Sequence, residues 1–257
     1  MEVHKHPHHV THKKKWTEYL LEFFMLFLAV FLGFVAENIR ENISKHEREK
    51  ELMVMMVEDL KTDVNKFDTS IKYNTIKLNK LDTLRHLVYS SANTPLPDTS
   101  IKKMYYLVRL YGGSRYLFNP TVRTLNQFDK NDAFRLIRKQ EVSDSIVDYH
   151  DGEIQLVQQE NVFNDFQIKA FETGDKIFNS ELMERFLSRD SANAVLQSTQ
   201  QFQLLSQDKQ TLLLYGSKLF LARAVLFNFI NQMEAQKAKA KSLSELIRKE
   251  YHLEKNE

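Results

Sequence analysis

The acidic run SDSIVDYHDGE has the side-chain spacing best suited to a metal ion in this sequence. Asp144, Asp148 and Asp151 are separated by four and three residues, so in a helix they lie on one face, with His150 beside them. Carboxylate oxygens and an imidazole are ligands for divalent cations. The alternative is a solvated helix face that ends near Gly152, and we favour it because Asp side chains are mostly exposed.

Histidines are concentrated at the N-terminus, where five of the nine in the chain lie within nine positions: His4, His6, His8, His9 and His12. Clustered imidazoles bind Zn, Cu or Ni. Pro7 and the lack of an apolar pattern leave this tail without preformed geometry, and no Asp or Glu lies between the histidines to complete a coordination shell. We therefore predict adventitious metal binding here and no bound cofactor.

Familiar catalytic motifs are missing from the sequence. It contains no HExxH, GxSxG, P-loop or GxGxxG pattern. Without cysteine it can have no disulfide, thiolate zinc site or cysteine nucleophile. Lys and Arg number 36 and Asp and Glu 34, a formal charge of +2, which argues against a nucleic-acid partner. We predict a non-enzyme. The catalytic alternative is a membrane-bound hydrolase or lipid-modifying enzyme that uses Asp148 or His150, which substitution of either residue would test.

Aromatic and cationic side chains are interspersed between residues 105 and 115. Tyr105, Tyr106 and Tyr111 together with Arg109 and Arg115 have the composition of a ligand groove. The competing interpretation places the aromatic rings in the protein core. We favour the core, because large aromatic side chains dominate core packing.

Among the structural elements that must position these residues, the clearest is a long apolar segment. Residues 19–36 read YLLEFFMLFLAVFLGFVA, and Glu22 is the only one that is neither apolar nor small. Eighteen helical residues extend ~27 Å, close to the hydrocarbon thickness of a bilayer. A signal peptide fits poorly, because cleavage after Ala36 would put Phe34 at position −3. We predict an uncleaved transmembrane helix over 16–36 that crosses the lipid bilayer once.

Five side chains of this segment bear on its role. Trp16 and Tyr19 are placed as interfacial aromatics. Glu22 is either a functional group or, as we favour, a side chain that snorkels to the interface or pairs with a nearby lysine. Ala29 and Gly33 form a small-xxx-small pair that would let two such helices approach closely.

The two flanks of the segment carry equal numbers of Lys and Arg. The N-terminal flank is a short tail with Lys5, Lys13, Lys14 and Lys15. The cations of the other flank lie within residues 40–50 and belong to a large domain, which can be translocated regardless of charge. We therefore favour a cytoplasmic N-terminus, with residues 37–257 on the other side of the membrane.

Past residue 36 the apolar positions follow alternating steps of four and three, the pattern of a heptad seam. No Gly or Pro lies between Gly33 and Pro95, so we predict one helix to about residue 91 and a break over 92–98. Asn74 is a polar position in the seam, which can fix register and oligomeric state. The seam packs either against a second chain or within its own. Its central residues are Leu60, Val64, Phe67, Ile71, Asn74, Leu78 and Leu81.

A second seam with the same steps runs from Leu212 to Ile247. Two long seams of this kind predict an antiparallel helix pair. The predicted fold is all-α: an N-terminal transmembrane helix that continues into an elongated antiparallel bundle with coiled-coil-like packing. The predicted domains are a tail over 1–15, the membrane helix over 16–36 and an extracytoplasmic helical domain over 37–257.

The opening MEVHKHPHH…HKKKWTEYLLEFFMLFLAVFLGFVAENIRE resembles a family of uncharacterised single-pass membrane proteins of Bacteroidota. The resemblance continues in EREKELMVMMVEDLKTD and more faintly in AFRLIRKQEVSDSIVDYH and AKSLSELIRKEYHL. It implies an inner-membrane protein of a Gram-negative cell with a helical domain in the periplasm. It carries no catalytic residue over to this chain.

Two non-catalytic functions fit these features. The first is an interaction or scaffold protein, a membrane-anchored helical bundle that binds another envelope protein or a second copy of itself. The second is a periplasmic sensor that binds a small ligand between helices and acts through a partner, because a tail of about 15 residues cannot hold a signalling domain. An apolar interhelical cavity would favour the sensor, and a filled bundle with an exposed seam the interaction protein.

Overall fold

The computed structural model describes residues 15–114, 118–130, 133–187 and 189–254. Every regular element in these ranges is a helix, which confirms the all-α prediction. The elements are α1 (Trp16–Ser91), α2 (Asp98–Leu107), the π-helix η1 (Val108–Gly112), α3 (Arg123–Lys130), the 3₁₀-helix η2 (Ala133–Leu136), α4 (Gln140–Gly174), α5 (Ser180–Glu184), α6 (Arg189–Gln197) and α7 (Lys209–Glu250). The five clustered histidines of the N-terminal tail, and Arg115, lie outside the described residues.

α1 is a single helix of 76 residues. It ends at Ser91, and the next helix begins at Asp98, directly after Pro97. The break therefore falls where the two prolines of this stretch exclude helical backbone, as the sequence predicts.

The chain divides into two compact units, Met1–Glu51 and Leu52–Glu257. The division lies C-terminal to residue 36, where the sequence places the end of the membrane segment. Residues 37–48 of α1 are exposed and carry ion pairs along the helix, such as Arg40–Glu37 at 2.6 Å and Lys45–Glu41 at 2.7 Å. Pairs at these spacings stabilise a helix without tertiary contacts. The first apolar side chain of α1 that is buried is Leu52, where the second unit begins.

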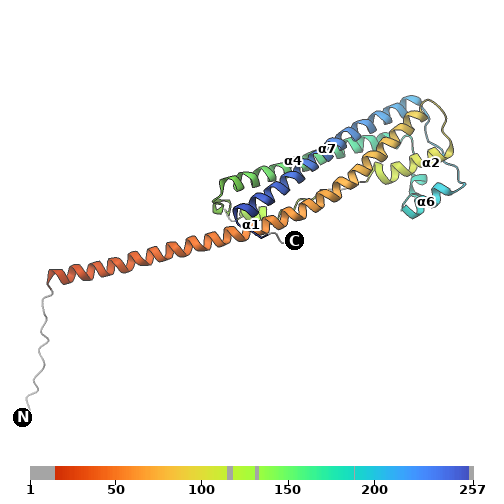
Figure 1. The fold of residues 1–257 in the computed structure, drawn as a ribbon. Helices are drawn as coiled ribbons and strands as arrows, with labels where there is room; N and C mark the ends of the chain where they lie inside the picture. Colours follow the sequence, from red (N-terminus) through yellow and green to blue (C-terminus); the bar gives the residue numbers. More distant parts are fainter. Residues whose placement is uncertain (1–14, 115–117, 131–132, 188, 255–257) are drawn as a thin grey trace, which may run out of the picture. The chain divides into compact units, whose positions relative to one another are not determined.

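Three long helices form the second unit: the later part of α1, α4 and α7, which lie alongside one another (Figure 1). Asp68 and Asp82 of α1 pair with Lys237 at 2.6 Å and with Arg223 at 3.2 Å, respectively. The numbers rise along α1 as they fall along α7, so these two helices are antiparallel, as their two seams predict.

α4 is a third long member of this bundle, which the sequence did not place there. Tyr149 of α4 bonds to Asp63 of α1, and Gln167 bonds to Lys77, so α4 runs parallel to α1. It is consequently antiparallel to α7. Three helices in this arrangement each bury one stripe against the other two.

Two apolar clusters fill the bundle. The buried members of cluster 1 include Leu52, Leu60, Leu125, Val142, Ile146, Tyr149, Ala240 and Ile247. Those of cluster 2 include Phe67, Leu81, Tyr105, Leu156, Phe163, Leu219, Leu226 and Met233. Removing such side chains from water is the main source of the free energy of folding.

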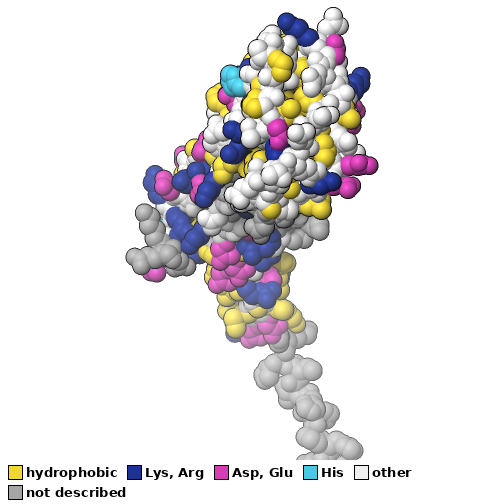
Figure 2. Space-filling view, turned by 90° about the vertical axis from the view of Figure 1, so that its right-hand side faces the viewer, with side chains coloured by type: hydrophobic (Ala, Val, Ile, Leu, Met, Phe, Trp, Pro, Cys, Tyr) yellow, Lys and Arg dark blue, Asp and Glu magenta, His cyan; other side chains and the backbone are white. Residues whose placement is uncertain are grey.

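The short helices α2, η1, α5 and α6 pack around cluster 2, whereas α3 and η2 belong to cluster 1. The hydroxyl of Tyr105 in α2 donates to the carbonyl of Gln203 at 2.7 Å and accepts from the backbone N–H of Asn179 at 2.9 Å. The buried ammonium of Lys102 donates to the carbonyl of Ser198 at 2.7 Å. These bonds attach the chain on both sides of α5 and α6 to α2. Figure 2 looks at the side of the molecule where these helices lie and shows hydrophobic side chains exposed among charged ones.

Among the described residues, two helices are long and apolar enough to cross a membrane, α1 and α7. The sequence analysis above predicts only one crossing. The two helices differ in burial, because the apolar window of α1 is 0% buried and that of α7 is 39% buried. α7 passes the same test because it is rich in Leu and Phe, yet part of that surface, including Leu219 and Leu226, belongs to cluster 2.

Candidate functional site

A layer of buried polar side chains separates the two apolar clusters. Asp63 of α1, Glu153 of α4 and Gln236 of α7 are all buried. In its own helix, each lies between the buried members of one cluster and those of the other. We call these three residues together with Tyr149 the polar layer. Buried polar groups cost free energy unless they are paired, so the partners of this layer show what it does.

Asp63 is the centre of the polar layer and is 1% exposed. Its Oδ2 accepts from the hydroxyl of Tyr149 at 3.0 Å. Its Oδ1 accepts from the backbone N–H of Thr121 at 2.9 Å and from the Thr121 hydroxyl at 2.5 Å, and the ammonium of Lys66 lies 3.4 Å away. Both carboxyl oxygens are therefore satisfied inside the protein, which removes much of the cost of burying them.

Asp59, one turn earlier in α1, attaches the start of α3. Its Oδ2 accepts from the backbone N–H of Thr124 at 2.9 Å and from the Thr124 hydroxyl at 2.6 Å. Its Oδ1 lies 2.8 Å from the guanidinium of Arg123. The first N–H groups of a helix lack intrahelical partners and favour negative charge. Asp59 thus caps α3 from another helix, and together with Asp63 it holds residues 121–124 against α1.

Glu153 is 2% exposed, and neither of its carboxyl oxygens has a hydrogen-bond partner among the described residues. Burial, and after it the charge of Asp63, raise the pKa of Glu153 to about 8. The group therefore holds its proton at neutral pH. Nδ1 of His150, which is partly open to solvent, lies 3.7 Å from Oε2 of Glu153. Burial also raises the pKa of Tyr149.

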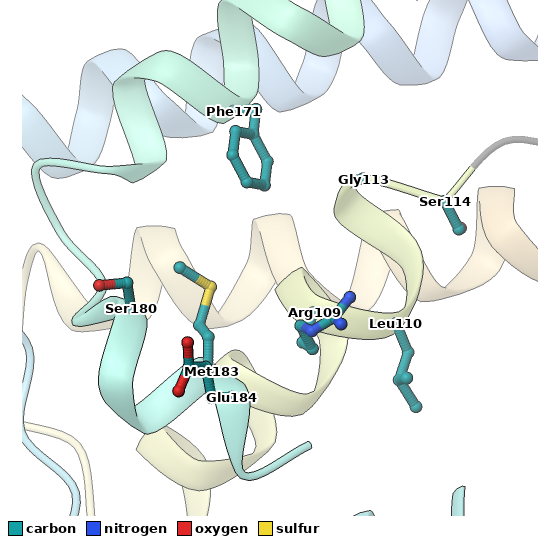
Figure 3. A pocket seen from close by; sticks show the side chains of 8 residues that line it. All are labelled: Arg109, Leu110, Gly113, Ser114, Phe171, Ser180, Met183 and Glu184. Carbon is teal, nitrogen blue, oxygen red and sulfur yellow. The ribbon is translucent and has the colours of Figure 1, made fainter. Parts of the chain in front are cut away.

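A pocket of 580 Å³ lies between η1, the C-terminal part of α4 and α5 (Figure 3). Small-molecule sites in proteins enclose about 300–1,000 Å³. In Figure 3 the ring of Phe171 comes from α4, the side chains of Met183 and Glu184 come from α5, and Arg109 comes from η1. The lining residues are Arg109, Leu110, Gly113, Ser114, Phe171, Ser180, Met183 and Glu184.

The tyrosines between residues 105 and 111 do not form a groove with Arg109, and Arg115 lies outside the described residues. Tyr105 and Tyr111 are buried in cluster 2, which confirms the core interpretation for both, and Tyr106 packs against the same cluster. Arg109 is exposed and lines the pocket instead. Arg109 is separated from the tyrosines because successive helical residues point in different directions.

The heptad seam of α1 is covered by the same chain. Five of its central residues are buried and two are half-buried within the second unit. The buried ones are Leu60, Phe67, Asn74, Leu78 and Leu81, and the half-buried ones are Val64 and Ile71. Of the two alternatives left open by the sequence, packing within the chain is the one that this burial supports, so the seam is not a free surface for a partner.

The acidic face of α4 is exposed to solvent. Asp144 accepts from the side chain of Gln140 at 2.8 Å, and Asp148 pairs with Lys239 of α7 at 2.7 Å. Asp151 is exposed. In the part of the chain that the structure describes, no group of three or more His, Asp or Glu side chains is arranged to hold a metal ion. The arrangement is that of a wet helix face.

The membrane-segment residues are all exposed. Trp16 and Tyr19 are 84% and 56% exposed, and Glu22, Ala29 and Gly33 are exposed with them. A Cβ added at Gly33 would meet nothing within 4 Å. Within the described residues, the small-xxx-small face is therefore uncovered.

Comparisons with family models, curated proteins and solved structures find no match to this chain. The resemblance to membrane proteins of Bacteroidota stays a prediction.

Sequence reasoning missed the polar layer, although one signal for it was present. Glu153, Glu160 and Gln167 recur every seven residues, on the buried stripe of α4. A polar residue at every second position of a three-four repeat indicates a seam with polar layers. Asp63 gave no comparable signal, because it lies beside the apolar seam of α1 rather than in it.

Proposed function

We propose that this chain is a membrane-anchored helical scaffold protein of the cell envelope that binds a second copy of itself. The observation that carries the anchor is the apolar window of α1, which is 0% buried. A helix that is apolar on all sides is stable where lipid surrounds it. In contrast, the corresponding window of α7 packs partly within its own bundle.

The proposed location is the inner membrane, with the N-terminal tail in the cytoplasm and the bundle in the periplasm. The supporting features are the lysines of the short tail and the implication of the family resemblance. The absence of cysteine makes a direct test simple, because any introduced cysteine is the only thiol in the chain.

The test uses the single-cysteine variants Thr11→Cys and Ser44→Cys, one on each side of the apolar segment. We expect a membrane-impermeant maleimide to label Ser44→Cys in spheroplasts and Thr11→Cys only after lysis. Both variants should stay in the membrane after carbonate extraction. The reverse labelling pattern would overturn the orientation, and release by carbonate would overturn the anchor.

An apolar stripe on α7 is the surface that supports self-association. Leu214, Phe220, Leu221 and Phe227 are between 40% and 51% exposed. At 100° per residue these four positions lie within roughly 140° of one another on the helix circumference. Apolar residues that gather on one surface mark interaction sites, unlike apolar residues scattered singly.

The stripe is self-complementary. If two α7 helices pack antiparallel with Ala224 opposite its own copy, Leu221 faces Phe227 and Ser217 faces Asn231. In the same register Phe220 faces Asn228, and Leu214 faces Glu234 at the edge of the contact. The centre of the face, from Ser217 to Asn231, bears no charged side chain, so no charge would be buried there. A two-fold interface requires this kind of self-matching surface, which is why a second copy is the occupant that we propose.

The mass of the full chain in nanodiscs tests self-association. We expect twice 30.4 kDa of protein per assembly for the wild-type chain and 30.4 kDa for the double variant Phe220→Glu/Phe227→Glu. Val157→Glu, at an exposed apolar position of α4, is the matched control and should keep the dimer. A wild-type monomer, or an equal amount of a different protein in place of the second copy, would refute self-association.

A sensing function is the second proposal, and one observation favours it. The pocket between η1, α4 and α5 has the volume of a small-molecule site and both polar and apolar lining residues.

A further inference from the structure

The pocket contains two ionisable side chains of opposite sign that have no partner among the described residues. Arg109 comes from η1 and Glu184 from α5, and both are exposed. Within the described residues, neither side chain forms an ion pair or hydrogen bond. In the same described part of the chain, the hydroxyl of Ser180, also in the lining, has no hydrogen-bond partner. Three polar groups are therefore available to a ligand.

The backbone that presents Arg109 is itself unusual. Residues 98–112 form one continuous helical stretch whose last turn, Val108–Gly112, is π-helical. A π-helical turn is rare and is found often at functional sites, because it changes the direction of its side chains. Val108 and Tyr111 of this turn are buried, and Arg109 is directed to the pocket.

The remaining walls of the pocket are largely apolar. Phe171 and Met183 face the space in Figure 3, and Leu110 also lines it. An aromatic ring and a thioether adapt to apolar groups of different shapes. The pocket thus combines a cation, an anion and an apolar wall.

We propose that this pocket binds a free amino acid with an apolar side chain. The guanidinium of Arg109 would bind the carboxylate through two hydrogen bonds, a geometry that suits this fork. The carboxylate of Glu184 would bind the ammonium, and Phe171 and Met183 would contact the side chain. A free amino acid carries a carboxylate, an ammonium and an apolar side chain on one carbon, so it matches all three kinds of lining residue. The proposal goes beyond the scaffold function and does not depend on self-association.

The experiment titrates the full chain in nanodiscs with L-phenylalanine, L-leucine and L-methionine by isothermal calorimetry. Two probes each lack one charge: phenylalaninamide has no carboxylate, and N-acetylphenylalanine has no ammonium. We expect saturable binding of at least one free amino acid and at least about tenfold weaker binding of the matching amide and N-acetyl compound, because hydrogen bonds to charged groups contribute about 1.5–3 kcal/mol.

Two variants assign the charges. Arg109→Gln should weaken the binding of the free amino acid at least about tenfold and leave the binding of phenylalaninamide nearly unchanged. Glu184→Gln should weaken the binding of the free amino acid similarly and leave the binding of N-acetylphenylalanine nearly unchanged. The matched controls are Lys103→Gln and Glu181→Gln, exposed residues of α2 and α5 outside the pocket lining, and both should bind like the wild-type chain.

Several results would overturn the proposal. They are the absence of saturable heat with all three amino acids, equal binding of the free and capped compounds, or unchanged binding by both pocket variants. Because Arg109 and Glu184 are exposed and unpaired, their substitution should not disturb folding, and the circular dichroism of each variant checks this.

Discussion

The hydroxyl of Tyr149 on α4 donates a 3.0 Å hydrogen bond to Oδ2 of Asp63 on α1. Both residues are about 1% exposed, so this bond joins two helices in a place that water does not reach. The bond lies between two apolar clusters, whose non-directional contacts would by themselves permit α1 and α4 to shift along each other. A polar pair at such a position restricts register, because any other register leaves both groups unpaired.

Replacing Tyr149 with Phe removes this bond and keeps the ring. We expect the free energy of unfolding to fall by about 1–3 kcal/mol, because a buried carboxylate loses a donor. The measurement is urea unfolding followed by circular dichroism. Tyr106→Phe is the control, since the hydroxyl of Tyr106 has no hydrogen bond in the described structure, and it should change stability by less than about 0.5 kcal/mol. Equal effects of the two substitutions would contradict this role of Tyr149.

The raised pKa of Glu153 predicts how stability depends on pH. The pKa is about 8 in the folded chain against an ordinary value of 4.5, so between these values the folded state keeps a proton that the unfolded state releases. The stabilisation of the folded state that this proton provides is fully present below pH 4.5 and is lost as pH rises through 8. We expect the free energy of unfolding to fall across this window, measured by urea unfolding at successive pH values.

Glu153→Gln separates this residue from other titrating groups. Gln keeps the shape of the protonated acid and cannot ionise, so the variant should lose the slope and exceed the wild-type stability at pH 7 by on the order of 3 kcal/mol. Near pH 4 the two proteins should be similarly stable. Glu172→Gln, an exposed glutamate of the same helix, should keep the wild-type slope. If Glu153→Gln keeps it too, another group causes the pH dependence.

Asp59→Ala removes the cap of α3. Without the carboxylate, the backbone N–H and hydroxyl of Thr124 lose their acceptor inside the protein. Loss of a helix cap costs about 0.5–2 kcal/mol. We expect faster hydrogen–deuterium exchange in residues 121–130 and little change in α7. Glu58→Ala, which also pairs with Arg123 but is exposed, is the control and should leave this exchange nearly unchanged.

Gly152 of α4 predicts a steric effect across the polar layer. An added Cβ would overlap the side-chain amide of Gln236, whose Nε2 donates to the carbonyl of Tyr149 at 2.6 Å. Gly152→Ala should therefore destabilise the chain, although Ala is intrinsically better than Gly in a helix by about 1 kcal/mol. Adding Gln236→Ala should restore much of the loss. Gly113→Ala, where the nearest atom would be 3.6 Å away, should be tolerated. Thermal unfolding of the wild-type chain, Gly152→Ala, Gln236→Ala and the double variant gives the coupling between Gly152 and Gln236.

Much of the fold follows from the sequence alone, because its causes are local. The absence of Gly and Pro between Gly33 and Pro95 determines one long helix, and Pro95 and Pro97 determine its end. The steps of three and four from Leu212 to Ile247 determine the buried stripe of α7. The apolar run of residues 19–36 likewise needs no tertiary contact to be recognised.

The tertiary structure alone decided what covers each stripe. Periodicity shows that Leu60 and Phe67 share a face, but it cannot say whether a second chain or α4 and α7 lie against that face. The same limit hid the polar layer: Asp63, Tyr149 and Glu153 are buried together only because α1 and α4 pack in parallel. The pocket likewise brings Arg109 of the π-helical turn and Glu184, a residue 75 positions later, into one lining. Contacts between distant residues depend on how helices pack as bodies, and a local pattern contains no information on that choice.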